Sequence, residues 1–140
     1  MKTSSFLFGL VLAVAVIAVL LLTFGVNFRS TGPLKYNATT ESKTTGIVDS
    51  VQDFACPVSE GEIGTHVKIR TDSGLVQVHL APARIMRAHN LKFVPGERVE
   101  VLGSRVRYQG NDDVIAREIT RGHDFFVLRD QSGKLVLVQY

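Results

Sequence analysis

The 140-residue chain contains no tryptophan and a single cysteine, Cys56. One cysteine excludes a disulfide within the chain, and without paired cysteines the common structural zinc motifs are also excluded. The sequence has no Gly-x-Ser-x-Gly nucleophile elbow, and Gly61–Gly64 does not fit a glycine-rich phosphate loop. The adjacent Asp112 and Asp113 are typical of a turn. We therefore predict that the protein is not an enzyme, and we interpret Cys56 as a strand-end or loop residue.

The most prominent feature that is present is an uncharged apolar run from Phe6 to Phe28. A helix needs about 20 apolar residues to cross a bilayer. The run exceeds the apolar core of about 7–15 residues of a signal peptide, and no Ala-x-Ala-like cleavage step ends it. It predicts an uncleaved transmembrane signal anchor at residues 6–28, after a tail at residues 1–5. A cleaved signal peptide and a soluble helix are the alternatives.

Charges around this run give little information on its orientation. Lys2 precedes the run, whereas Arg29 and Lys35 follow it, so the bias used by the positive-inside rule is nearly balanced. The short N-terminal tail is the usual form of a signal anchor. We expect a single pass through the cytoplasmic membrane, with the C-terminal domain in the periplasm or outside the cell.

The residues after the run predict a polar linker at 29–43 and one globular domain at 44–140. Short segments of alternating apolar and polar residues, separated by turn residues, are typical of β-strands. Pro82 opens a segment that favours one short helix, and a hairpin is expected at the C-terminus. The predicted strands are near residues 46–51, 66–71, 76–80, 99–108, 114–119, 125–128 and 135–138.

Five strands with one helix between the third and fourth resemble an OB-fold barrel across Thr44–Thr120, and Pro95–Ser104 resembles the fourth-strand entry of such domains. The resemblance implies an all-β, five-stranded barrel with an added C-terminal hairpin. To keep the apolar side chains of strands two and three on one face, we predict that Arg70 pairs with Gln77 and that Lys68 pairs with His79.

OB-folds usually bind ligands on the face of strands two and three. That face is polar and cationic here, which fits either a solvated strand face or a surface for an anionic ligand or polyanion. Nucleic acid is disfavoured, because single-strand binders stack bases on aromatic side chains and this face has none. Two histidines of the face could approach each other, but no third metal ligand is evident, so no metal site is predicted. The candidate ligand-binding residues are His66, Lys68, Arg70, Gln77 and His79.

A membrane-anchored OB-fold of this length is also similar to the haem chaperone of bacterial cytochrome c maturation. That family carries haem on a His-x-x-x-Tyr motif just after the last barrel strand. His123 lies at the corresponding place, but the fourth residue after it is Val127 rather than tyrosine. The overall pattern, with Val78–Pro82 and Leu128–Asp130, resembles small exported bacterial OB-fold proteins of unassigned role.

We therefore expect a non-enzymatic, membrane-anchored binding or assembly module that contacts a protein partner or an anionic ligand. The first alternative is a haem or metal carrier that uses His123 or the His66/His79 pair. The second is a module that binds nucleic acid or another polyanion on the face of strands two and three. The apolar C-terminal hairpin either caps the barrel or docks a partner.

Overall fold

The computed structural model describes residues 33–59 and 61–140. The predicted anchor at residues 6–28 and the tail before it lie outside these residues. Within the described part of the chain, no helix is long and apolar enough to cross a membrane. The account below concerns the compact unit at Gly32–Tyr140.

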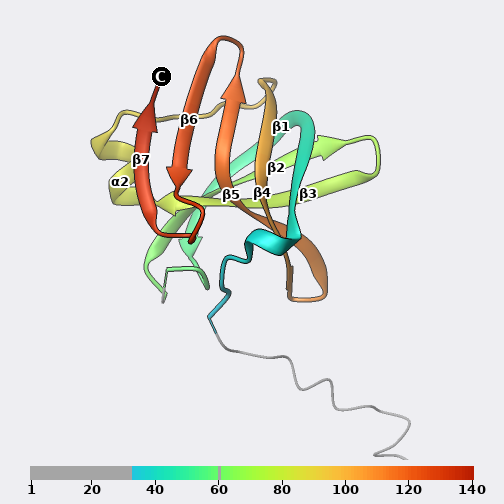
Figure 1. Cartoon of the computed structure of the whole chain (residues 1–140). Helices are drawn as coiled ribbons and strands as arrows, with labels where there is room; N and C mark the ends of the chain where they lie inside the picture. The colour runs from blue at the N-terminus through green and yellow to red at the C-terminus, as the bar shows by residue number, and fades with distance from the viewer. Residues whose placement is uncertain (1–32, 60) are drawn as a thin grey trace, which may run out of the picture. The chain divides into compact units, whose positions relative to one another are not determined.

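The described unit is an all-β structure with one short α-helix, as the alternating sequence pattern predicts (Figure 1). The strands, the helix and the terminal hairpin follow the predicted order, which is confirmed. The elements are η1 (Ala38–Thr40), β1 (Glu41–Ala55), β2 (Ile63–Thr71), β3 (Gly74–Pro82), α2 (Ala83–Ala88), β4 (Arg98–Tyr108), β5 (Asn111–Arg121), β6 (Asp124–Arg129) and β7 (Leu135–Gln139).

All seven strands belong to one sheet in the order β3-β2-β1-β4-β5-β6-β7, and neighbours in this order are antiparallel. The long strand β1 pairs with β4 through its first half and with β2 through its second half. The sheet curls, and β3 forms an additional parallel pairing with β5, at Val78↔Val114 and His79↔Ile115 (Figure 1). This pairing places β3 side chains beside the start of β5.

The predicted register of the β2–β3 hairpin is wrong by two residues. Arg70 pairs with Leu75 and Lys68 pairs with Gln77, so His79 lies opposite His66. The hairpin closes as a tight turn in which Thr71 pairs with Gly74, whose φ of 125° suits glycine. A two-residue turn matches the twist of paired strands better than the longer loop that we predicted. Because the shift is an even number of residues, the predicted apolar face is preserved.

One apolar cluster forms the core of the unit. Val67, Ile69, Val78 and Leu80 of β2 and β3 are fully buried there, and Met86 of α2 joins them. Phe126, Leu128 and Leu137 place the inner face of the β6–β7 hairpin in the same cluster. The outer face of β7 carries the exposed Val136 and Val138. The hairpin is therefore part of the core structure on its inner side.

Residues just before β1 are attached to the sheet. The backbone N–H of Asn37 donates a hydrogen bond to Ser104 Oγ at 3.0 Å, and Thr40 Oγ1 donates to the carbonyl of Arg105. β1 itself begins at Glu41. The last part of the segment that we predicted as a linker, residues 29–43, thus contributes hydrogen bonds and strand residues to the domain.

Candidate functional site

The five predicted ligand-binding residues do not form one exposed face. His66 is 2% exposed and His79 is fully buried, whereas Lys68 and Gln77 are half-buried and Arg70 is exposed. The expectation that both histidines point into solvent is wrong. The two ends of the same hairpin face therefore have different environments.

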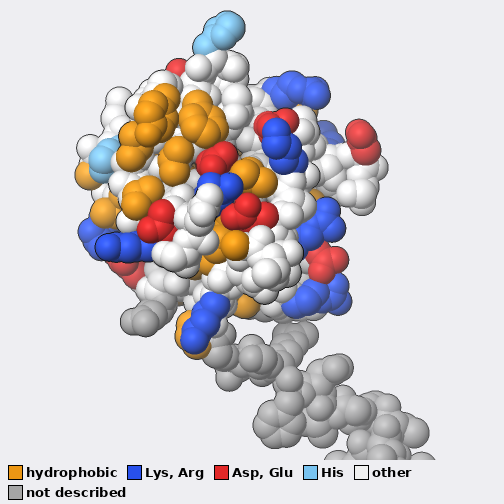
Figure 2. Space-filling view, in the orientation of Figure 1, with side chains coloured by type: hydrophobic (Ala, Val, Ile, Leu, Met, Phe, Trp, Pro, Cys, Tyr) orange, Lys and Arg blue, Asp and Glu red, His pale blue; other side chains and the backbone are white. Residues whose placement is uncertain are grey.

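At the turn end of the hairpin, acidic side chains accompany both positive charges. The Arg70 guanidinium forms a salt bridge with Asp49, and Lys68 lines a cavity of about 600 Å³ together with Asp112 and Asp113. Several further arginines, including Arg84, Arg107 and Arg121, also pair with carboxylates. On the face drawn in Figure 2, acidic and basic side chains are interspersed. These observations give no support to a cationic surface for a polyanion.

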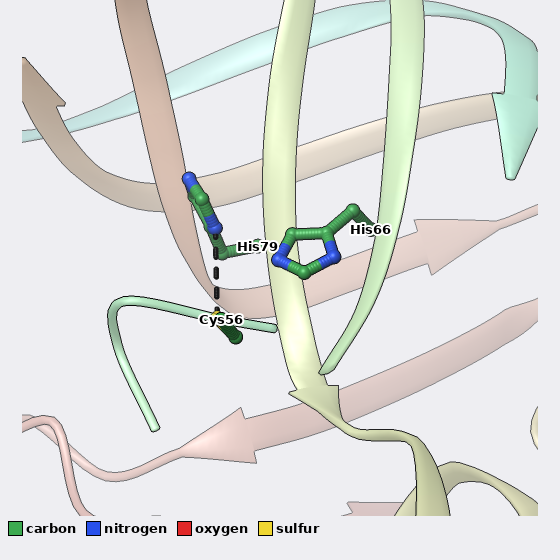
Figure 3. A group of neighbouring side chains, drawn as sticks. All are labelled: Cys56, His66 and His79. Carbon is green, nitrogen blue, oxygen red and sulfur yellow. Dashed lines mark hydrogen bonds between the residues drawn. The ribbon is translucent and has the colours of Figure 1, made fainter. Parts of the chain in front are cut away.

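At the other end of the hairpin, both histidines meet the only cysteine of the chain. Cys56 is 4% exposed, and its Sγ lies 3.7 Å from Nδ1 of His79. One donor atom from each of Cys56, His66 and His79 lies within 4.8 Å of the other two (Figure 3). We call these three residues the Cys-His-His cluster. Within residues 33–59 and 61–140, no other group of three or more His, Cys, Asp or Glu residues has this proximity.

A carboxylate orients the His79 ring from the side opposite Cys56. Its Nε2 lies 2.9 Å from Oδ2 of Asp113, which is 2% exposed and also accepts a hydrogen bond from Gln77 at 3.0 Å. An ionised carboxylate only accepts hydrogen bonds, so Nε2 carries a proton and donates it. Nδ1 is thereby directed at the Cys56 sulfur. Burial favours the neutral imidazole, but the hydrogen bonds to Asp113 and Cys56 outweigh it and raise the pKa of His79.

His66 has no such partner. Both of its ring nitrogens are buried, and neither forms a hydrogen bond with any residue that the structure describes. The Phe54 ring stacks on the imidazole at 3.6 Å between centroids, and His79 contacts it edge to face at 4.8 Å. An unpaired buried polar group costs about 1–3 kcal/mol, so such groups are rare and point to a missing partner.

The surroundings of the Cys56 thiol favour its ionised form. Burial by itself would raise the pKa of Cys56, but the two neighbouring imidazole groups outweigh that effect and lower it to about 5. Burial lowers the pKa of Arg129, which is 4% exposed, to about 10, and the negative charge of a Cys56 thiolate partly offsets this effect. A lowered pKa favours the thiolate, the form in which cysteine binds metals.

The local backbone explains how the cluster assembles. His66 and His79 are direct cross-strand partners, and the β2–β3 pairing shifts between Thr65 and His66. Cys56 follows the last residue of β1, and its N–H donates to the carbonyl of Glu62, which closes the turn. Gly64 leaves room for Cys56, because a Cβ there would lie 2.7 Å from the Cys56 Cβ.

Sequence reasoning placed His66 and His79 near each other but missed Cys56 and Asp113. Cys56 does start a turn, yet its side chain is buried over β2 and β3. Asp113 was interpreted as a turn residue, but it belongs to β5 and reaches His79 through the β3–β5 pairing. The predicted OB-fold order did offer a signal, because it places the third and fifth strands next to each other. His123 lies exposed between β5 and β6, and it is not part of the cluster.

Residues 40–126 match a family model described as the MamS/MamX magnetosome protein family. The match covers more than half of the chain and includes the whole Cys-His-His cluster and Asp113. It is not the haem-chaperone family with which the sequence was compared. No curated protein matches the chain.

Proposed function

Because this chain belongs to the MamS/MamX magnetosome protein family, and because its domain buries a thiol among two imidazoles, we propose that it is a non-enzymatic module that binds a transition-metal ion. The observation that carries this proposal is His66, whose two buried nitrogens have no hydrogen-bond partner among residues 33–59 and 61–140. A metal ion bound to one of them would supply that partner. Thiolate and imidazole are ligands that transition metals favour.

The spacing of the donors supports the same proposal. A metal bonded to sulfur at about 2.3 Å and to nitrogen at about 2.0 Å, at an angle of about 120°, separates the two ligand atoms by about 3.7 Å. The Cys56 Sγ to His79 Nδ1 distance is 3.7 Å. All three donors lie within 4.8 Å of one another, so closing the remaining separations needs only small side-chain movements.

The environment of His79 matches that of a metal ligand. Metal-bound histidines usually donate their other ring N–H to a carboxylate or carbonyl, which fixes the tautomer and the ring orientation. Asp113 performs this role at Nε2 and leaves Nδ1 facing the cluster. The carboxylate is itself held by Gln77. The donor set and its supporting hydrogen bonds are therefore assembled before any ion binds.

The order Cys56–His79–Asp113 also suits nucleophilic catalysis, in which a base activates a thiol and a third group orients the base. Burial argues against that use. Cys56 is 4% exposed, and neither the cavity of about 600 Å³ nor the one of about 420 Å³ is lined by Cys56 or His66. At 4% exposure the sulfur offers little surface to a substrate, whereas a single ion needs little room.

Two finer aspects of the proposal concern architecture. The circuit β1-β2-β3-β5-β4, closed by the β3–β5 pairing, supports a five-stranded OB-fold-like barrel.

The apolar run at residues 6–28 supports a membrane anchor with the domain outside the cytoplasm. A topology reporter fused after Tyr140 tests the second point: activity of a cytoplasmic reporter there would contradict it.

The metal proposal is tested with the full-length protein in detergent, titrated separately with Zn²⁺, Co²⁺, Fe²⁺, Cu⁺ and haemin. We expect one of the metal ions to bind in equimolar amount and to raise the unfolding temperature. Cys56→Ser and His66→Ala should abolish both effects. His123→Ala is the matched control, because this histidine is exposed and lies outside the cluster. Binding of haemin alone that is lost in His123→Ala would favour the haem-carrier alternative instead.

A further inference from the structure

The Cys-His-His cluster also restricts which ion it can hold. Resting on the proposed metal function, we infer that the ion is monovalent copper, held by three ligands: Cys56 Sγ, His79 Nδ1 and one ring nitrogen of His66. Three properties of the described residues lead to this choice: the type of donor, the number of donors, and the charge buried around them.

The donor types reduce the choice to a few metals. Thiolate favours Cu⁺ and Zn²⁺, and imidazole suits copper, zinc and iron. Ions that prefer carboxylate or carbonyl oxygens, such as Mg²⁺ and Ca²⁺, have no oxygen ligand in the cluster. Copper and zinc are therefore the two main candidates, and the remaining two properties separate them.

The number of donors favours copper. Zinc in proteins is almost always four-coordinate, and a zinc site with three protein ligands adds a water molecule. Asp113 is occupied by His79 and Gln77, and the neighbouring Phe54 and Tyr108 present aromatic rings to the two histidines. Neither of the two cavities described above reaches Cys56 or His66. The three ligands are at most 4% exposed, so water has little access as a fourth ligand. Such a three-ligand set suits Cu⁺, which is stable with two or three ligands.

The buried charge favours a monovalent ion. Metal binding requires Cys56 as a thiolate and both histidines as neutral ligands. Asp113 adds a second negative charge and Arg129 adds a positive one. Among the described residues, the Arg129 side chain donates only to the carbonyls of Leu80 and Ala116, both at 2.5 Å, and it forms no ion pair. The sum of these charges is one negative charge, which one Cu⁺ neutralises.

A divalent ion would leave an excess positive charge in the same place. Uncompensated charge is costly in a buried site, because water does not solvate it there. The Arg129 guanidinium donates a hydrogen bond to the carbonyl of Leu80, the residue that follows His79 in β3, so its charge lies beside the cluster. Arg129 therefore acts as a selectivity residue that disfavours divalent ions, although it is not itself a ligand.

The test uses full-length protein in detergent under anaerobic, reducing conditions, with Cu⁺ supplied as its complex with bicinchoninate. We expect the protein to remove an equimolar amount of Cu⁺ from the chelator, and X-ray absorption at the copper edge to show one sulfur and two nitrogen ligands. Cys56→Ser and His66→Ala should not compete with the chelator. His123→Ala should compete as well as the unaltered protein.

Parallel titrations with Zn²⁺ and Co²⁺ distinguish this inference from the proposed function. Tighter binding of Zn²⁺ than of Cu⁺, together with a tetrahedral Co²⁺ spectrum, would overturn the copper inference and leave the metal function standing. Binding of no ion would end both.

The role of Arg129 is tested by substitution. Arg129→Gln should raise the affinity for Zn²⁺ relative to Cu⁺ by about tenfold, because one nearby positive charge is lost. Arg129→Lys keeps the charge and should preserve the preference for Cu⁺. If Arg129→Gln does not fold, the lysine variant and the competition in the unaltered protein still decide the matter, since a preference for Zn²⁺ in either of them would contradict the inference.

Discussion

The two ends of the β2–β3 hairpin share a face and a sequence pattern, but their surroundings are opposite. At the turn end, Arg70 and Leu75 pair with each other and both are exposed. At the other end, His66 and His79 pair with each other and both are buried. Strand alternation therefore determines which side chains share a face, and it does not determine whether that face meets water.

The difference arises from what covers each end. Phe54 from β1, Cys56 from the turn after it and Asp113 from β5 surround the histidines. At the turn end, the neighbouring Asp72 and Ser73 belong to the hairpin's own turn and are exposed. Burial at one end is thus a property of long-range contacts. Substitutions at the two ends should accordingly have very different effects.

The largest effect is expected from Asp113→Ala. This change leaves the buried His79 N–H and the half-buried Gln77 amide without their acceptor, so the free energy of unfolding should fall by about 3 kcal/mol. Metal affinity should fall by about 10–100-fold, because His79 loses its orienting partner. Urea denaturation of the full-length protein and a metal titration measure the two effects.

Asp112→Ala is the matched control for this substitution. Asp112 is the adjacent residue, its side chain is 74% exposed, and it pairs with the exposed Arg107. The control should change stability by less than about 0.5 kcal/mol and should leave metal affinity unchanged. Equal effects of the two alanine variants would show that Asp113 has no special link to the cluster.

An intermediate effect is expected from Gly64→Ala. The added methyl group would lie 2.7 Å from Cys56 Cβ and 3.3 Å from a ring carbon of His66, so the cluster must shift to admit it. Overpacking of this kind costs about 1–3 kcal/mol. Alkylation of the Cys56 thiol should become faster and metal binding weaker, as followed by mass spectrometry and titration.

Gly74→Ala supplies the comparison at the turn end. Its φ of 125° makes a side chain unfavourable, but a Cβ there would meet no atom within 4 Å. This variant should lose stability by about 1–3 kcal/mol through backbone strain alone. Its metal affinity should equal that of the unaltered protein, and a parallel loss of affinity would contradict the separation of the two ends.

Much of the fold follows from local sequence signals. Alternation in Val67–Ile69 and Val76–Val78 predicts two strands with a common apolar face, and Pro82 predicts the start of α2. The hairpin register was missed by two residues because a tight turn and a longer loop of the same parity bury the same side chains. The pattern of side chains decides whether a register shift can be an odd or an even number of residues. The exact register depends on turn geometry.

The site was harder to predict from the sequence. Cys56, His66, His79 and Asp113 come from four segments, and no fixed spacing joins them. Two contacts could have been anticipated: the cross-strand histidine pair, and the approach of β5 to β3 that the predicted strand order implies. The position of Cys56 over Gly64 could not, because it depends on how the turn after β1 folds back against β2.

The smallest effect is expected from Arg70→Ala, which removes the salt bridge with Asp49 at the turn end. The Arg70 side chain is 70% exposed, so water and salt already screen the pair. The free energy of unfolding should fall by less than about 1 kcal/mol, and the difference should shrink further at high salt. Metal affinity should not change, because the substitution leaves the other end of the hairpin intact. Denaturation at low and high salt, with a metal titration of the same samples, checks both statements. A measurable loss of metal affinity would show that the paired charges at the turn are coupled to the buried cluster through the two strands.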